Sequence, residues 1–240
     1  MKKKLLWILL LVLLVALAAL YMIFIGWNFP ADATAVAALA SDETVQVRET
    51  DYGWHFDGPS DERALIFYPG GKVEATAYAP LLHQLASEGL DACLVQMPLR
   101  LSFFGADRAS TVMAEHDYPH WYIGGHSLGG VSAGTYASTH SDMLDGVILL
   151  ASYVSKPLGD GLDVLMIRGS TDGVLNMKRY EASMSLVPAS TVEVVIEGGN
   201  HAQFGSYTLK QTDGSPSISG EEQMRQTVRA ILDFLPSGES

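Results

Sequence analysis

The chain has 240 residues, of which 48% are hydrophobic and 18% are charged, and its formal net charge is −12 at pH 7. This excess of acidic groups repels nucleic acids and anionic lipid surfaces, so a nucleic-acid partner is excluded. Cys93 is the only cysteine in the sequence and lies in an apolar run, which predicts a buried thiol and excludes a disulfide framework.

The first thirty residues differ in character from the rest of the chain. Three lysines follow Met1, and the stretch 5–25 then contains neither a charged residue nor a proline. As a helix, this stretch extends about 31 Å, which matches the hydrocarbon thickness of a bilayer. The pattern predicts that residues 1–30 form a single-pass anchor in the cell membrane, with the N-terminus cytoplasmic and the remaining chain extracytoplasmic. Tyr21, Trp27 and Phe29 suit the far interface.

The alternative is a signal peptide that is cleaved near residues 31–33, which would release a secreted protein. Residues 31–42 are rich in small side chains and predict a linker to one domain over residues 43–240.

Strand and helix patterns alternate through this domain. Nearly continuous apolar strands that alternate with helices are typical of a mainly parallel sheet covered by helices on both faces, so the expected fold class is α/β. We expect strands at 44–48, 52–56, 64–68, 91–97, 120–123, 146–150, 164–167 and 192–196, and helices at 77–87, 106–116, 131–140, 177–186 and 219–235.

The most informative motif is Gly125-His126-Ser127-Leu128-Gly129, which lies between an apolar strand and a helix of small residues. A strand-to-helix turn this sharp holds its central residue in a strained conformation, and the flanking glycines remove Cβ atoms that would collide there. Ser127 is thereby lifted toward a substrate as a nucleophile. The N–H of Leu128 begins the helix, where it is placed to stabilise an oxyanion. The alternative interpretation is an ordinary serine in a glycine-rich loop.

A serine hydroxyl needs a histidine base, and that histidine needs a carboxylate to fix its tautomer. Asp172 and His201 each follow an apolar strand, and the carboxyl ends of parallel strands share one edge of the sheet. Their order along the chain, Ser127 then Asp172 then His201, is the order expected for this architecture. His116 and His120, in the connection before the serine's strand, remain reserve candidates for the base.

Adjacent glycines in the loop 68–73 allow backbone N–H groups to approach a substrate closely. Gly71 is therefore the expected second donor of an oxyanion hole, beside the amide of Leu128. Neither the nucleophile nor this hole needs a metal ion or an organic cofactor. Candidate substrate contacts are Lys72, His126, Phe103 and Phe204. Core packing explains the aromatic members equally well, and the alternative for Lys72 is a solvated charge in the loop.

This glycine-rich loop and the Gly-His-Ser-Leu-Gly-Gly turn resemble those of the alpha/beta-hydrolase superfamily, particularly its small bacterial members. The resemblance covers residues 64–235 and implies a serine hydrolase of the carboxylesterase or lipase type. It also implies a triad of Ser127, Asp172 and His201, and an oxyanion hole at Gly71 and Leu128. Because only residues 155–162 separate two late strands, we expect no sizeable cap domain and an open site.

Other activities use the same residues. An acyltransferase or a thioesterase passes through the same acyl-enzyme, and a non-catalytic binding module keeps the scaffold without the chemistry. The substrate we expect is a small-molecule ester. The sequence does not specify its acyl length, nor the oligomeric state of the protein.

Overall fold

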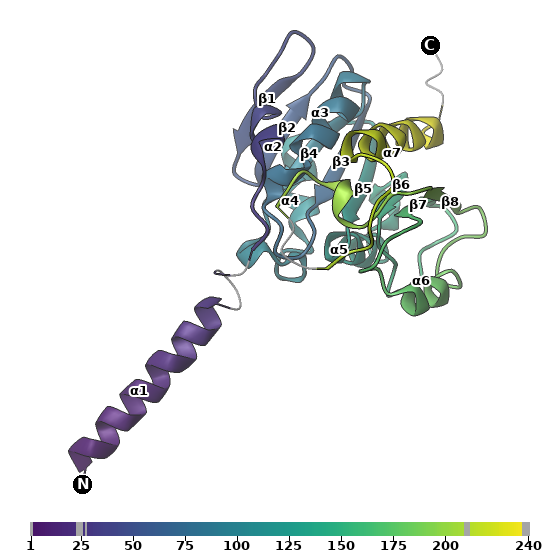
Figure 1. Ribbon diagram of the computed structural model, residues 1–240. Helices are drawn as coiled ribbons and strands as arrows, with labels where there is room; N and C mark the ends of the chain where they lie inside the picture. Colours follow the sequence, from purple (N-terminus) through teal and green to yellow (C-terminus); the bar gives the residue numbers. More distant parts are fainter. Residues whose placement is uncertain (1, 23–25, 27, 209–211, 237–240) are drawn as a thin grey trace.

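The computed structural model describes residues 2–22, 26, 28–208 and 212–236, and its centre is one eight-stranded sheet with the order β1-β2-β4-β3-β5-β6-β7-β8 (Figure 1). β1 and β2 form an antiparallel hairpin, and β2 also pairs antiparallel with β4. The other pairings are parallel. The predicted α/β class is confirmed. The strands are β1 (Gln46–Thr50), β2 (Gly53–Asp57), β3 (Arg63–Tyr68), β4 (Asp91–Val95), β5 (His120–His126), β6 (Gly146–Leu150), β7 (Asp163–Gly169) and β8 (Val192–Ile196).

Helices cover both faces of the sheet because successive strand residues point to opposite sides. In β3, Leu65 and Phe67 belong to one buried core, whereas Ala64 and Ile66 belong to the other. The first core also contains side chains of α3 (Ala79–Ser87) and α7 (Gly220–Phe234), and α2 (Ala33–Ala37) lies against α3. The second contains α4 (Arg108–Glu115), α5 (Leu128–Ala137) and α6 (Met177–Ser183). Short 3-10 turns are η2 (Ala75–Tyr78), η3 (Pro98–Arg100), η4 (Ser102–Phe104), η5 (Ser141–Met143) and η6 (Ala202–Phe204).

The connection between β6 and β7 is short. Residues 151–162, all of which the structure describes, contain neither a helix nor a strand. This part of the chain therefore adds no cap over the carboxyl edge of the sheet.

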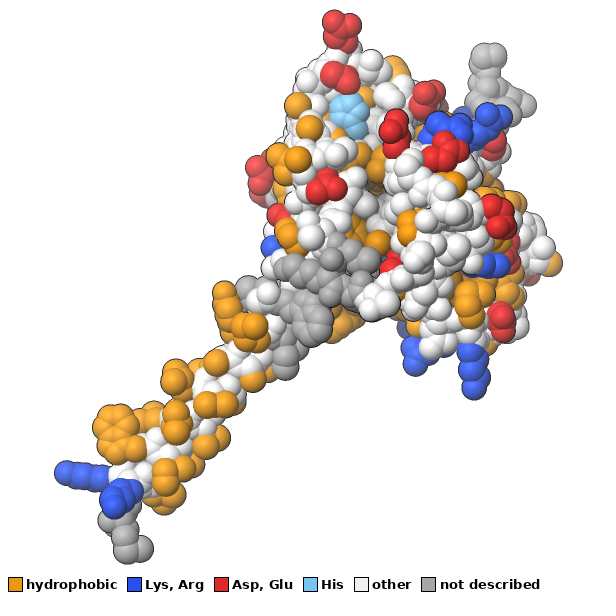
Figure 2. All heavy atoms as spheres, viewed as in Figure 1, with side chains coloured by type: hydrophobic (Ala, Val, Ile, Leu, Met, Phe, Trp, Pro, Cys, Tyr) orange, Lys and Arg blue, Asp and Glu red, His pale blue; other side chains and the backbone are white. Residues whose placement is uncertain are grey.

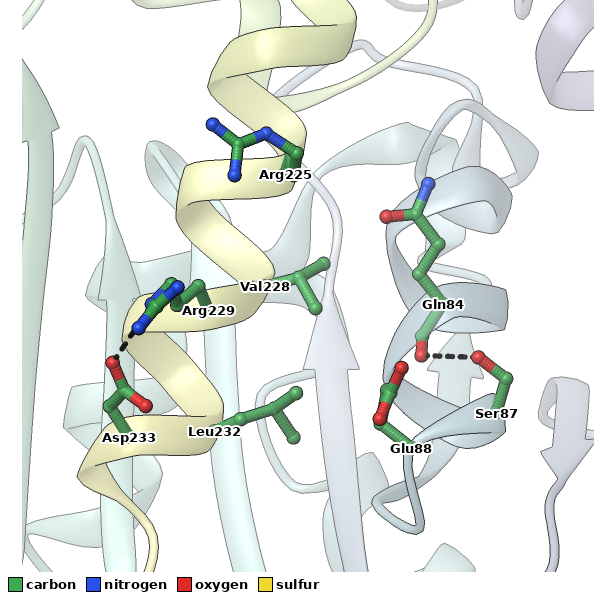
Figure 3. Close-up of a pocket in the computed structure, with 8 residues that line it drawn as sticks. All are labelled: Gln84, Ser87, Glu88, Arg225, Val228, Arg229, Leu232 and Asp233. Carbon is green, nitrogen blue, oxygen red and sulfur yellow. Dashed lines mark hydrogen bonds and ion pairs between the residues drawn. The ribbon is translucent and has the colours of Figure 1, made fainter.

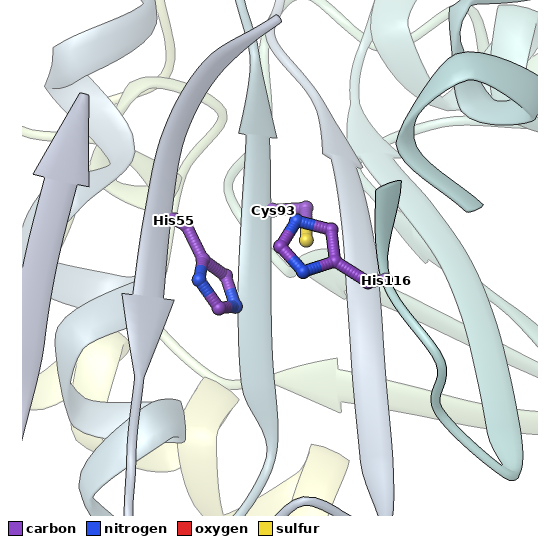
Figure 4. A group of neighbouring side chains, drawn as sticks. All are labelled: His55, Cys93 and His116. Atoms are coloured by element: carbon purple, nitrogen blue, oxygen red, sulfur yellow. The ribbon is translucent and has the colours of Figure 1, made fainter. Parts of the chain in front are cut away.

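The second core includes a small polar cluster, drawn in Figure 4, that joins β2 and β4 to the connection after α4. One ring nitrogen of His55, one of His116 and the Cys93 sulfur lie within 4.8 Å of one another. The Tyr52 hydroxyl lies 2.9 Å from His116 Nε2 and 3.5 Å from Cys93 Sγ. Burial lowers the pKa of His55 to about 4 and raises that of Cys93 to about 12. The cluster is therefore uncharged near neutral pH.

A shallow groove lies between α3 and α7 on the outer surface, as Figure 3 shows. Its walls are mainly polar side chains of the two helices, including an ion pair between Arg229 and Asp233. None of the expected catalytic residues lines it.

α1 (Lys2–Tyr21) projects away from the domain (Figure 1), and apolar side chains surround it (Figure 2). Residues Lys3–Tyr21 are long and apolar enough to cross a bilayer, and the domain does not cover them. Met1, residues 23–25 and Trp27 of the predicted anchor lie outside the described residues.

The segment 31–42, which we expected to be a linker, packs on the domain instead. Asp32 accepts the Ala35 N–H at 3.0 Å and caps α2, and Ala35 is buried. Phe29 is buried as well, and it pairs with Val73 in an isolated parallel bridge. Small side chains suit a flexible connection, but they also allow close packing.

Candidate active site

Ser127 lies in the sharp turn between β5 and α5. Its backbone has φ 52° and ψ −121°, in the left-handed half of conformational space that non-glycine residues rarely adopt. A Cβ atom at Gly129 would lie 2.0 Å from the Tyr68 carbonyl oxygen, so only glycine permits this approach of α5 to β3. The turn holds the half-buried Ser127 at the carboxyl edge of the sheet.

Asp172 and His201 lie together at the same edge. His201 Nδ1 is 2.9 Å from Asp172 Oδ2, and the two side chains are only 5% and 2% exposed. Asp172 Oδ1 accepts the N–H groups of Val174 and Leu175, both at 2.8 Å. Burial raises the pKa of Asp172, but the hydrogen bond to His201, its charge and the two amides outweigh burial and leave that pKa below its ordinary value. The carboxylate is therefore ionised and oriented toward the imidazole.

The His201 ring lies beside the sharp turn that carries Ser127. Its centroid is 4.6 Å from that of His126, the residue directly before Ser127. The three residues of the expected triad, which are far apart in the sequence, thus gather at one end of β5, β7 and β8. The chain order and the sheet edge are those expected from the sequence.

The two expected oxyanion donors are also neighbours. A Cβ atom at Gly71 would lie 3.0 Å from Leu128 Cδ2, which places the loop after β3 against the first residue of α5. The Lys72 N–H donates a hydrogen bond to the Arg100 carbonyl at 2.7 Å. Lys72 therefore helps to hold this loop in place through its backbone.

The candidate substrate contacts occupy different environments. Phe103 is 55% exposed and Lys72 is half-buried. His126 and Phe204 are only 1% and 2% exposed and lie in the interior, with their rings 5.8 Å apart. The structure does not support a substrate contact for His126 or Phe204, because surrounding side chains cover both.

His126 instead belongs to a buried hydrogen-bond chain that the sequence analysis missed. The Gly70 N–H donates to the Tyr78 hydroxyl at 3.0 Å, and that hydroxyl is hydrogen-bonded to His126 Nδ1 at 2.7 Å. Burial first, and the neighbouring His201 second, hold the pKa of His126 well below its ordinary value. A neutral His126 adds no positive charge beside His201. The sequence could not have indicated this chain, because a tyrosine eight residues after a glycine is not a pattern that predicts a hydrogen bond between them.

Asp213 is a second residue that the sequence analysis missed. Its Oδ1 accepts the Gly173 N–H at 3.0 Å, and its Oδ2 accepts the Ala202 N–H at 2.9 Å. Gly173 follows Asp172 and Ala202 follows His201, so one carboxylate links the two loops. No local pattern distinguishes this aspartate from an ordinary turn residue.

The two reserve histidines lie elsewhere. His116 belongs to the polar cluster of the second core, where its Nε2 lies 2.9 Å from the Tyr52 hydroxyl. His120 begins β5 and pairs with Asp145 at 3.1 Å. That pair is at the amino edge of the sheet, away from Ser127.

The sheet order, the sharp turn and the loops at its carboxyl edge define a hydrolase scaffold. Residues 64–225 match the alpha/beta hydrolase family, and the chain belongs to that family. No curated protein matches the chain in sequence.

Several solved structures share the fold. Est1E from Butyrivibrio proteoclasticus has a TM-score of 0.56 at 15% identity, over 81% of this chain and 100% of that one. Dienelactone hydrolase from Anabaena variabilis has a TM-score of 0.59 at 12% identity, over 80% and 100%. A membrane phospholipase A, described as a bacterial virulence factor, has a TM-score of 0.59 at 14% identity, over 99% and 100%.

Proposed function

We propose that this hydrolase cleaves carboxylic esters through an acyl-enzyme and that residues 1–30 anchor it in the membrane. Ser127 is the nucleophile, His201 the general base and Asp172 the carboxylate that orients it. The amides of Gly71 and Leu128 form the oxyanion hole. The observation that carries this proposal is the buried Asp172–His201 pair, 2.9 Å apart, whose imidazole packs beside the turn of Ser127.

The proposed chemistry follows from these positions. Asp172 accepts the Nδ1 proton of His201, which leaves Nε2 as the basic atom that takes the serine proton during attack. The two backbone amides stabilise the negative charge on the tetrahedral intermediate. His201 then gives its proton to the leaving alcohol, and it later activates a water molecule that releases the acid. The names of the similar phospholipase A and dienelactone hydrolase denote cleavage of esters, which agrees with this substrate class.

The anchor is supported by the packing of the residues that follow it. Cleavage near residues 31–33 would cut the chain between Phe29, which is buried in the domain, and α2. A signal peptide is normally removed from a flexible stretch that a peptidase can reach. The lysines before the apolar run place the N-terminus in the cytoplasm and the domain outside.

The decisive experiment replaces the nucleophile. Ser127→Ala should abolish hydrolysis of short p-nitrophenyl esters and labelling by a fluorophosphonate probe, while thermal unfolding stays close to that of the wild type. Ser155→Ala, an exposed serine in the connection after β6 at the same edge, is the matched control and should keep both activities. Full activity of a folded Ser127→Ala protein would overturn the proposal.

A further inference from the structure

The segment that joins α1 to the domain is hydrogen-bonded to the loop that carries Gly71. The Phe29 N–H donates to the Lys72 carbonyl at 2.9 Å, and the Glu74 N–H donates to the Phe29 carbonyl at 3.0 Å. Two residues later, the Ala31 N–H donates to Glu74 Oε2 at 3.1 Å. We refer to residues 29–32 as the tether segment.

The other side of the tether segment is bonded to the chain that follows η6, just after His201. The Asp32 N–H donates to the Ser206 carbonyl at 3.1 Å, and the Thr208 N–H donates to the Pro30 carbonyl at 3.0 Å. The tether segment thus lies between the loop of the oxyanion hole and the loop of the base. The anchor leaves the domain at the carboxyl edge of the sheet, where the candidate site lies.

Chain length then limits the distance between this edge and the bilayer. α1 ends at Tyr21, eight residues before Phe29, and eight extended residues span at most about 28 Å. A domain of this size is about 40 Å across. The carboxyl edge is therefore the part of the domain held close to the membrane, and the amino edge is the part that points away.

Three large apolar side chains are exposed beside the candidate site. Leu99, Phe103 and Phe104 are 47%, 55% and 52% exposed, and they come from η3 and η4. We refer to these three residues as the apolar rim. Leucine and phenylalanine are the side chains that proteins insert into the boundary between headgroups and acyl chains.

The apolar rim is attached to the catalytic loops by hydrogen bonds. The Lys72 N–H donates to the carbonyl of Arg100, which follows Leu99, at 2.7 Å. The Ser102 hydroxyl, just before Phe103, donates to the Leu128 carbonyl at 3.0 Å. The rim therefore borders the oxyanion hole.

From these contacts we propose that the active site opens toward the bilayer and that its substrate is an ester-linked acyl lipid of the adjoining leaflet. This inference rests on the proposed anchor and on the proposed ester hydrolysis. Ser127 Oγ attacks the acyl carbonyl carbon, the bond from that carbon to the glycerol oxygen breaks, and His201 passes the serine proton to the departing lysolipid. Water then cleaves the acyl-enzyme and releases the fatty acid.

The net charge of −12 opposes electrostatic attraction to an anionic bilayer. The anchor and the apolar rim, and not surface charge, hold the site at the lipid. Zwitterionic phosphatidylcholine vesicles are therefore the suitable probe, with release of fatty acid as the readout and p-nitrophenyl butyrate as a soluble ester measured on the same preparation.

The first test lengthens the tether. Four Glu-Ala-Ala-Ala-Lys repeats inserted directly before Asn28 form a semi-rigid helix of about 30 Å. In the full-length protein reconstituted into vesicles, this spacer should lower fatty-acid release at least about tenfold and leave hydrolysis of the soluble ester unchanged. A Gly/Ser spacer of equal length is the matched control, because a flexible chain lets the domain return to the surface, and it should retain most of the vesicle activity.

The second test removes part of the apolar rim. The double variant Leu99→Ser/Phe104→Ser should lower the ratio of vesicle activity to soluble-ester activity about tenfold, because the site loses apolar surface that enters the lipid. Met143→Ser/Val192→Ser removes equally exposed apolar side chains from the opposite edge of the sheet and should leave the ratio unchanged.

The outcomes separate the two proposals. If the wild type does not hydrolyse the soluble ester, the proposed ester hydrolysis itself is overturned. Soluble-ester hydrolysis without any release of fatty acid from vesicles would overturn only the lipid substrate. Equal vesicle activity of the wild type and of the protein with the rigid spacer would overturn the orientation of the site toward the bilayer.

Discussion

Replacement of Asp172 by asparagine tests the role of the buried Asp172–His201 pair. Asp172 Oδ1 accepts two amide hydrogens, and Oδ2 faces His201 Nδ1. An asparagine has one oxygen and one NH2 group, so it can keep only one of these two arrangements. The competition between them determines the tautomer of His201.

The amides decide this competition. Turning the NH2 group toward the N–H groups of Val174 and Leu175 would set a donor against two donors, and the loss at the part-buried Leu175 N–H alone is about 1 to 3 kcal/mol. If the oxygen stays with the amides, the NH2 group donates to Nδ1 of His201 and no hydrogen bond is lost. The proton of the neutral imidazole then moves to Nε2, the atom that has to accept the serine proton. We expect kcat to fall about 10⁴-fold, or about 5 kcal/mol in the barrier.

The assay is the hydrolysis of p-nitrophenyl butyrate, with thermal unfolding as the check on folding. Asp145→Asn is the matched control, since Asp145 also contacts a histidine, His120 at 3.1 Å, but at the opposite edge of the sheet. Its activity should stay within about twofold of the wild type. A folded Asp172→Asn enzyme with kcat within tenfold of the wild type would refute the assigned role of Asp172.

Three further predictions follow from other contacts. Gly129→Ala places a Cβ atom 2.0 Å from a backbone oxygen and should lower the free energy of unfolding in urea by at least about 3 kcal/mol, whereas Gly161→Ala, with open space around it, should leave it almost unchanged. Asp213→Ala removes the carboxylate that joins the loops of the acid and the base, so kcat should fall about tenfold to a hundredfold with little change in KM. An unchanged kcat would show that these loops hold their positions without Asp213. The pKa of His55 is lowered from 6.5 to about 4, mainly by burial. As the pH falls through this range, only the unfolded state takes up a proton at His55, so the free energy of unfolding decreases by about 3 kcal/mol. His55→Gln removes this loss, and its unfolding free energy should therefore gain about 3 kcal/mol relative to the wild type between pH 7 and pH 4; parallel pH profiles of the two proteins would contradict this assignment.

Local patterns were sufficient to predict much of the sheet. The mainly apolar runs at 146–150 and 192–196 predicted β6 and β8 with their observed bounds. β6 is buried throughout, as its unbroken apolar run requires, whereas β8 lies at the edge of the sheet and is partly exposed. The closing helix was also readable, since Ser219 accepts the Glu222 N–H at 3.1 Å as the spacing of a cap requires. Ser127 was identifiable because a strained turn requires glycines at fixed offsets.

Contacts between distant parts of the chain could not be predicted in this way. No local pattern in the sequence predicts the burial of His126 and Phe204. The same holds for the hydrogen bonds from Gly70 to Tyr78 and from Gly173 to Asp213, because each joins residues that are not neighbours in a motif. The composition of residues 31–42 predicts a linker, because small side chains indicate a flexible segment. Composition does not show which surface such a segment contacts.

By itself, the sequence determined the fold class and the sharp turn at Ser127, because each depends on patterns within single strands, turns and helices. It also predicted the chain order of the proposed triad residues. Only the tertiary structure decided that Asp172 and His201 pair at 2.9 Å and that residues 29–32 lie between the loop of Gly71 and the chain that follows His201. The physical reason is that backbone conformation is set by neighbours along the chain, whereas burial and pairing depend on which loops the twisted sheet brings to the same edge.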